Sequence, residues 1–282
     1  MTSYGDRQDP AYVPYQNKGY IPKDDAPMVG GMYTKDQDYE ILEAGFVPST
    51  LAQGMAIGGS ASGGAVELER QLRLGFIRKV YGILTVQLLL TAVVAAVCVL
   101  SDTVRVGILN NLWTTWVGFG LSIGLLLGLL CYRDKYPLNM YLLGTWTFVM
   151  AYTVGVVCAA YASQGMGTVV VQAAGLTMAV FLGLTIFTFQ TKIDFSFLGG
   201  ALFAGLWILL IWGFVMAIFG FRQSYLYSLF GAILFSLYIL FDTSQLMNHL
   251  GYDEYIVASI NLYLDILNLF LYILRLLTRD NR

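Results

Sequence analysis

Two apolar stretches near the end of the chain decide the fold: Tyr225–Leu246 (YLYSLFGAILFSLYILFDTSQL) and Tyr255–Leu277 (YIVASINLYLDILNLFLYILRLL). Each has about the 20 residues that an α-helix needs to cross roughly 30 Å of hydrocarbon at about 1.5 Å per residue. A membrane-spanning β-strand would be half as long and would alternate strictly between polar and apolar residues, and neither stretch does so. The sequence therefore predicts two transmembrane helices joined by a tight turn at Gly251–Asp253.

Five earlier stretches have the same character, and the connections between consecutive stretches are short. Short connections favour antiparallel neighbours, so we predict an all-α integral membrane protein, a bundle of seven transmembrane helices. The composition agrees, because only 12% of the residues are charged, against about 25% in a typical soluble chain. The mean hydropathy is +0.65. The five earlier stretches are Val80–Leu100, Leu112–Tyr132, Met140–Ala162, Thr168–Phe189 and Phe197–Phe219.

The first 66 residues differ in kind from the rest of the chain. They hold five of the six prolines, many tyrosines and glycines, and twice as many acidic as basic residues. They show no apolar periodicity, and residues 1–10 lack the basic start and apolar run of a secretory signal peptide. We therefore predict two parts: residues 1–66 as a disordered cytosolic tail rich in Pro, Gly and Tyr, and residues 67–282 as the seven-helix transmembrane domain. The net charge of −2 gives no electrostatic reason to expect nucleic acid as a partner.

The distribution of Lys and Arg between the predicted helices indicates the orientation, because positive residues gather on the cytosolic side. A cytosolic N-terminus places seven of them on that side and two, Arg105 and Arg222, on the other. The seven are Arg70, Arg73, Arg78, Lys79, Arg133, Lys135 and Lys192.

The end of the chain leaves the number of crossings open. The length of the last stretch favours seven crossings, with the C-terminus opposite to the N-terminus. Arg275, Arg279 and Arg282 instead favour a cytosolic C-terminus, which would need a re-entrant last segment.

Two carboxylates within the predicted membrane spans, Asp242 and Asp265, are the strongest functional signal. A charged carboxylate near the bilayer centre costs roughly 2.5–3.5 kcal/mol or more, so such residues are usually functional. Counted from the turn between their helices, the two residues differ in depth by only ~4–5 Å, less than one helical turn. The two side chains can therefore meet. Polar residues on the same helix faces extend this site: Tyr238, Gln245, Asn261 and Asn268, with Gln87 and Gln172 as further candidates.

Two acids in a low-dielectric seam should hold one shared proton near neutral pH. After that proton is lost, the two charges repel each other and attract a cation, above all Ca²⁺, which prefers hard oxygen ligands. Asp242 and Asp265 are too few for a closed Ca²⁺ cage, so weak or transient binding during permeation is expected. The alternative is a purely structural hydrogen bond between the two helices. His249, the only histidine, is too isolated in the sequence to predict a metal site or a catalytic triad.

The same residues carry a resemblance to a known family. Phe241–Gln245 (FDTSQ), Glu254–Ile256 (EYI), Asn261–Leu274 (NLYLDILNLFLYIL) and Gly75–Tyr81 (GFIRKVY) resemble the transmembrane BAX inhibitor motif family, lifeguard branch. The resemblance covers about residues 67–282. It implies a bundle with the last helix central, residence in the ER or Golgi membrane, Ca²⁺ leak without a cofactor, and suppression of cell death.

For the site, the resemblance implies that Asp242 and Asp265 are the paired aspartates whose protonation gates Ca²⁺ flux. Its implied partners are the lipid bilayer, calcium ions and apoptosis-regulating membrane proteins. Some family members hold the closed state with an arginine in the second helix. Leu112–Tyr132 contains none, and Arg133 lies just beyond it, so that feature is not carried over.

Other classes of membrane protein fit the residues less well. A retinal protein needs a lysine in the last helix, and Tyr255–Leu277 has none. A G-protein-coupled receptor would place its N-terminus outside the cell. An intramembrane aspartyl protease has Gly-x-Gly-Asp at its second aspartate, where this chain has Leu262–Asp265 (LYLD), so no enzyme activity is expected. A proton-coupled transporter and a non-conducting scaffold that regulates apoptosis remain as alternatives.

Overall fold

The computed structural model describes residues 61–220 and 225–280, and every regular element in these ranges is a helix. Residues 1–60, most of the predicted tail, lie outside the described residues. The tail's final residues, 61–66, belong to the first helix instead. In chain order the elements are α3 (Ala61–Leu100), α4 (Asp102–Asn110), α5 (Trp113–Cys131), α6 (Leu138–Ser163), α7 (Gly167–Gln190), the 3₁₀-helix η1 (Phe195–Leu198), α8 (Gly199–Phe219), α9 (Tyr225–Asn248) and α10 (Tyr255–Asp280).

Seven of these helices, α3 and α5 to α10, are long and apolar enough to cross a membrane, which confirms the predicted class. Two details differ from the prediction. Helix α3 begins well before Val80, and its 40 residues extend about 60 Å, twice the hydrocarbon thickness. A short helix, α4, lies where the sequence predicted only a connection. Ser101 begins α4, and its side chain accepts a hydrogen bond from the Val104 backbone N–H.

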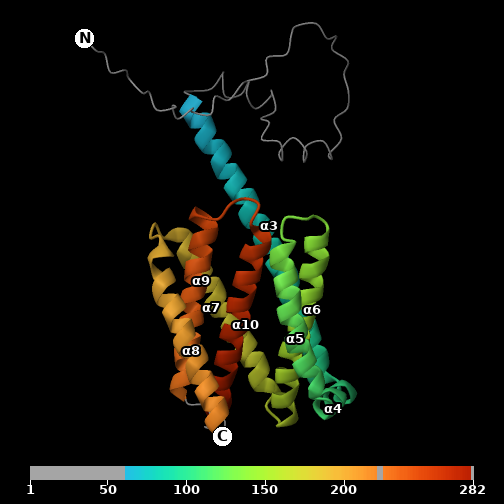
Figure 1. Ribbon diagram of the computed structural model, residues 1–282. Coiled ribbons are helices and arrows are strands. Elements are labelled where there is room, and N and C mark those ends of the chain that lie inside the picture. Colours follow the sequence, from blue (N-terminus) through green and yellow to red (C-terminus); the bar gives the residue numbers. More distant parts are fainter. Residues whose placement is uncertain (1–60, 221–224, 281–282) are drawn as a thin grey trace, which may run out of the picture. The chain divides into compact units, whose positions relative to one another are not determined.

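Helix α10 is the centre of the bundle. Of its most apolar stretch, 72% is buried, against 17% to 50% in the other six membrane-spanning helices. Its Tyr263 is fully buried, packs edge-on against Trp146 of α6 with ring centroids 5.6 Å apart, and shares a 2.7 Å hydrogen bond with Thr91 of α3. Helix α10 is continuous and runs the length of the bundle (Figure 1), so the re-entrant alternative is wrong.

Helices α9 and α10 pack closely because glycine permits it. A Cβ added to Gly231 of α9 would lie 2.5 Å from Cε1 of the Tyr272 ring on α10. Such a side chain would overlap the ring, so only glycine allows this approach. The close packing fixes the register of the two helices that carry Asp242 and Asp265.

One end of the bundle gathers the start of the membrane-spanning part of α3, the α7–α8 connection and the α9–α10 turn (Figure 1). Arg73 of α3 donates hydrogen bonds to the carbonyl oxygens of Leu250 (2.6 Å) and Leu246 (3.4 Å) at the end of α9. Its guanidinium also lies 4.7 Å from the ring centroid of Tyr252. These contacts attach α3 to the α9–α10 turn, directly beside the candidate site.

Candidate functional site

Asp242 on α9 and Asp265 on α10 are neighbours across the seam between the two helices. Their carboxyl groups are within hydrogen-bonding distance of each other. Asp265 is 5% exposed, and its Oδ2 is buried without a hydrogen bond from any N–H or hydroxyl group of the described residues. Because a buried carboxylate oxygen without a donor is unstable, the group best placed to supply a proton to the Asp265 carboxyl is the carboxyl of Asp242.

A pocket of about 330 Å³ opens beside Asp242 at the end of the bundle that carries the α9–α10 turn. Asp242 lines it and Asp265 does not, so Asp265 is the more enclosed member of the pair. The pocket joins one carboxyl group of the pair to polar side chains near the turn. Its lining residues are Phe241, Asp242, Gln245, His249, Leu250, Ala258 and Asn261.

The other polar residues predicted for the seam divide into two groups. Gln245 and Asn261 line the pocket, and Tyr238 lies close enough to interact electrostatically with both carboxyl groups. Asn268 does not line the pocket, and its side chain donates to the Leu264 carbonyl of its own helix at 2.8 Å.

The two further glutamines lie elsewhere, so the expectation that they extend the seam is wrong. Gln87 is buried between α3 and α6, where its Nε2 donates to Thr147 Oγ1 at 3.0 Å. Gln172 is exposed on the outer surface of α7. Both residues have the right type and depth for the seam, but their helices present them to different neighbours.

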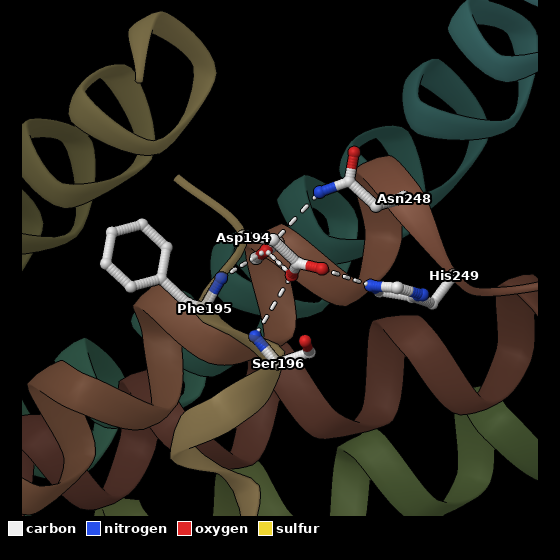
Figure 2. A network of polar contacts seen from close by, with 6 residues as sticks. Asp194, Phe195, Ser196, Asn248 and His249 are labelled. Atoms are coloured by element: carbon white, nitrogen blue, oxygen red, sulfur yellow. Dashed lines mark hydrogen bonds and ion pairs between the residues drawn. The ribbon is translucent and has the colours of Figure 1, made fainter. Parts of the chain in front are cut away.

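A second polar site, which the sequence analysis missed, is centred on Asp194 in the α7–α8 connection (Figure 2). Its Oδ2 lies 2.8 Å from His249 Nε2. Its Oδ1 accepts hydrogen bonds from the Ser196 backbone N–H at 3.0 Å and from the Ser244 hydroxyl at 3.1 Å. The Ser244 oxygen in turn accepts from the Phe195 backbone N–H at 3.1 Å and from the Asn248 side chain at 3.4 Å.

These hydrogen bonds stabilise the charged form of Asp194. The Ser196 backbone N–H, followed by His249, lowers the pKa of Asp194 from 3.8 to about 2. Asp194 therefore carries its negative charge throughout the physiological pH range. The arrangement is not a catalytic triad, because the Ser244 hydroxyl donates to the aspartate and not to the histidine.

The Asp194 network connects directly to the pocket. Ser244 lies two residues after Asp242 on α9, and His249 lines the same pocket as Asp242. The α7–α8 connection is thus bonded to the last turns of the helix that carries one of the paired acids. Sequence patterns gave no signal for this pairing, because Asp194 and His249 lie 55 positions apart in two connections without periodicity.

The described residues contain no cluster of three or more His, Cys, Asp or Glu side chains that could hold a metal ion. Asp242 and Asp265 can supply only a few oxygen ligands, which is fewer than the six to eight that Ca²⁺ takes in a closed site.

Six apolar helices around a buried seventh, with two acids in contact inside the bundle, define a multi-pass membrane protein. Residues 73–282 match the family described as inhibitor of apoptosis-promoting Bax1. The chain belongs to this BAX inhibitor family.

Several relatives share most of their length with the chain. The Golgi anti-apoptotic protein of vaccinia virus (strain Lister) is 44% identical over 213 residues, which cover 75% of this chain and 88% of the viral protein. The BI1-like protein of Arabidopsis thaliana is 43% identical over 250 residues, covering 85% and 90%. The mouse (Mus musculus) protein lifeguard 4 is 40% identical over 213 residues, covering 75% and 87%.

Proposed function

We propose that the chain is a pH-sensitive Ca²⁺ leak channel of an intracellular membrane, the Golgi or the ER, that regulates calcium homeostasis and suppresses cell death. The observation that carries the channel proposal is the contact between Asp242 and Asp265 beside a pocket. The anti-apoptotic names of several relatives support the role in cell death, and the viral relative's name supports the Golgi.

The mechanism follows from one proton shared by two carboxyl groups. With the proton in place, the pair forms a hydrogen bond that holds α9 and α10 together and carries a single negative charge. When the proton leaves, two like charges in a low-dielectric seam repel each other and attract a divalent cation. In this proposal, Ca²⁺ enters through the pocket and reaches Asp242 first. The more deeply buried Asp265 is the next carboxyl group along its path.

No catalytic chemistry and no cofactor is part of this proposal, and calcium acts only as the permeant ion. A proton-coupled transporter would use the same shared proton, but its flux would depend on the gradient of a second solute. A scaffold that regulates apoptosis through membrane-protein partners would conduct nothing.

Calcium flux into liposomes that contain the purified protein tests the proposal. Wild-type flux should rise between pH 6 and pH 8 as the shared proton is lost. In the double variant Asp242→Asn and Asp265→Asn, the two amides can still hydrogen bond but cannot titrate. Its flux should stay at or below the wild-type value at pH 6 and should lose most of the wild-type rise between pH 6 and pH 8.

The matched control is Asn268→Asp. It adds a carboxylate on α10 one turn from the pair and leaves the pair intact, so it tests whether an additional acid outside the pair alters the pH response. We expect the original pH response to persist in this control. A double variant that conducts as the wild type does from pH 6 to pH 8 would refute the gating role of the pair.

A further inference from the structure

The chain has a single histidine, and the structure places it at the entrance to the pocket beside Asp242. His249 is half-exposed and contacts Asp194, a carboxylate that stays charged because three polar contacts surround it: the Ser196 backbone N–H, the Ser244 hydroxyl and His249 itself. Histidine is the side chain whose charge ordinarily changes between pH 5 and pH 8. The contact between His249 and Asp194 is an ion pair when the imidazole is protonated and a neutral hydrogen bond when it is not.

The other charged groups near His249 come from three sides. On α9, Asp242 shares the pocket with it. From α3, Arg73 binds the carbonyl of Leu250, the next residue. In the α9–α10 turn, the Glu254 carboxylate accepts the Gly251 backbone N–H at 3.0 Å, and Asp253 lies close to the same glycine. Asp194 is the one of these groups in direct contact with the imidazole.

The Asp194–His249 contact joins two segments whose separation would open the α9–α10 seam. Asp194 belongs to the connection between α7 and α8, whereas His249 directly follows the last residue of α9 (Figure 2). Ser244, which also bonds to Asp194, lies in the last turns of α9. The α9–α10 seam can widen at this end only if the end of α9 moves relative to its neighbours. A stronger Asp194–His249 contact holds the end of α9 against the α7–α8 connection and opposes this movement.

We propose that His249 and Asp194 form a second pH-responsive gate, a latch at the pocket entrance that acts separately from the Asp242–Asp265 pair. The inference rests on the proposed function, because it gives the Ca²⁺ pathway its regulation from one side of the membrane. Protonated His249 closes the latch through the ion pair, and its positive charge beside the pocket also repels an approaching Ca²⁺. Loss of the proton weakens the contact and removes this repulsion.

Two substitutions of the same residue separate the two charge states. His249→Gln keeps a hydrogen-bond donor for Asp194 but is neutral at every pH, and His249→Lys is positive throughout the range tested. At pH 6, His249→Gln should conduct about twofold to fivefold more Ca²⁺ than wild type, the ratio that a partly exposed ion pair supplies. At pH 8, His249→Lys should conduct less than wild type by a similar factor.

Hydrogen exchange of the full-length protein gives a readout that does not require flux. The backbone N–H groups of Phe195 and Ser196 donate to Ser244 and Asp194, so their exchange reports how firmly the latch holds. At pH 8, these amides should exchange about twofold to fivefold more slowly in His249→Lys than in His249→Gln. After correction for intrinsic rates, the wild type should resemble the lysine variant at pH 6 and the glutamine variant at pH 8.

The two readouts distinguish the latch from the channel. Equal exchange in the lysine and glutamine variants would overturn the latch, whatever the flux. Normal exchange differences in a protein that carries no Ca²⁺ would refute the proposed channel and leave the latch as a feature of the fold. Exchange differences together with an unchanged flux response in both variants would show that the contact forms but does not gate, which also overturns the proposal.

Discussion

At the scale of single residues, three aspartates show how the surroundings determine the role of one side chain. Asp194 is surrounded by donors, so its carboxylate is stable and serves as a fixed negative charge. Asp265 is buried, and the described N–H and hydroxyl groups leave its Oδ2 without a donor. Asp242 lies between these extremes, with Asp265 on one side and the pocket on the other. The permanently charged Asp194 is therefore suited to hold neighbouring segments together, and the Asp242–Asp265 pair is suited to gain and lose a proton.

Replacing Asp194 by asparagine should destabilise the protein in a pH-dependent way. The folded-state pKa of Asp194 is about 2, below its ordinary value of 3.8, so its contribution to stability is complete above about pH 5. That contribution falls as the pH drops from about 4 towards 2. Thermal unfolding in detergent should therefore show a lower Tm for Asp194→Asn at pH 6 and no difference near pH 2. The control is Asp134→Asn, which removes an exposed carboxylate 3.6 Å from Arg133. An equal Tm difference at both pH values for Asp194→Asn would contradict this explanation.

Gly231→Ala should destabilise the bundle, because the new methyl group would overlap the buried Tyr272 ring. Overpacking of this kind costs about 1–3 kcal/mol, which thermal unfolding of the detergent-solubilised protein can measure. Gly183→Ala is the matched control, because an added Cβ at this exposed position of α7 meets no atom within 4 Å. Equal stability of the two variants would mean that the α9–α10 packing adjusts without loss.

At the scale of elements, the α9–α10 turn is held from two sides. Arg73 of α3 binds the carbonyl oxygens of Leu246 and Leu250, and Asp194 binds His249. The arginine acts as a C-terminal cap for α9 from a distant part of the sequence, since carbonyl oxygens at a helix end lack internal partners. Both α3 and the α7–α8 connection are therefore bonded to the α9–α10 turn at this end of the bundle.

Arg73→Ala should loosen this turn. Hydrogen bonds from a charged group contribute about 1.5–3 kcal/mol, so amides in residues 249–255 should exchange markedly faster in the variant. Exchange in Arg73→Lys should remain nearly as fast as in Arg73→Ala. A lysine ammonium group cannot make the flat contact with the Tyr252 ring together with the two carbonyl contacts.

The control for the turn is Arg78→Ala, which removes the same charge five residues further along α3. Arg78 is exposed and makes no ion pair or hydrogen bond with the described residues, so its loss should leave exchange at 249–255 unchanged. If both alanine variants accelerate exchange equally, the effect belongs to the net charge of α3 and not to the cap.

The elements also show what sequence patterns can and cannot predict. Long apolar stretches predict membrane spans well, because the thickness of the bilayer fixes their length. Helix α4 escaped prediction because it is short and amphipathic, and its residues look like those of a polar connection.

The residues of the candidate site were predictable only in part. Asp242 and Asp265 could be selected because a carboxylate inside a membrane is costly. Gln172 was misplaced because its type and depth do not reveal which way α7 turns it. The Asp194–His249 contact depends on how two loops meet, which periodicity does not contain.

At the scale of the whole molecule, the end of the bundle that carries the pocket and the Asp194 latch also carries most of the positive residues that flank the membrane-spanning stretches. Arg73, Lys79, Arg133, Lys135 and Lys192 belong to the start of α3 or to connections at that end (Figure 1). The positive-inside rule therefore predicts that the pocket beside Asp242 faces the cytosol. In this predicted orientation, cytosolic pH acts on the latch first and reaches the Asp242–Asp265 pair through the pocket.

Glycosylation of tagged chains in ER membranes tests both the orientation and the number of crossings. One chain carries a spaced Asn-x-Ser acceptor tag after Arg282, and the other carries the same tag within the connection between α5 and α6. Five helices, α6 to α10, separate the two positions. The tags must therefore lie on opposite sides of the membrane, whichever way the protein inserts. We expect glycan on the C-terminal tag alone, because the α5–α6 connection carries Arg133 and Lys135 and the positive-inside rule predicts that such a connection stays in the cytosol. Glycan on the internal tag alone would indicate the opposite orientation, with the latch on the luminal side. Glycan on both tags or on neither would contradict five crossings, and with them the arrangement that brings α9 and α10 together.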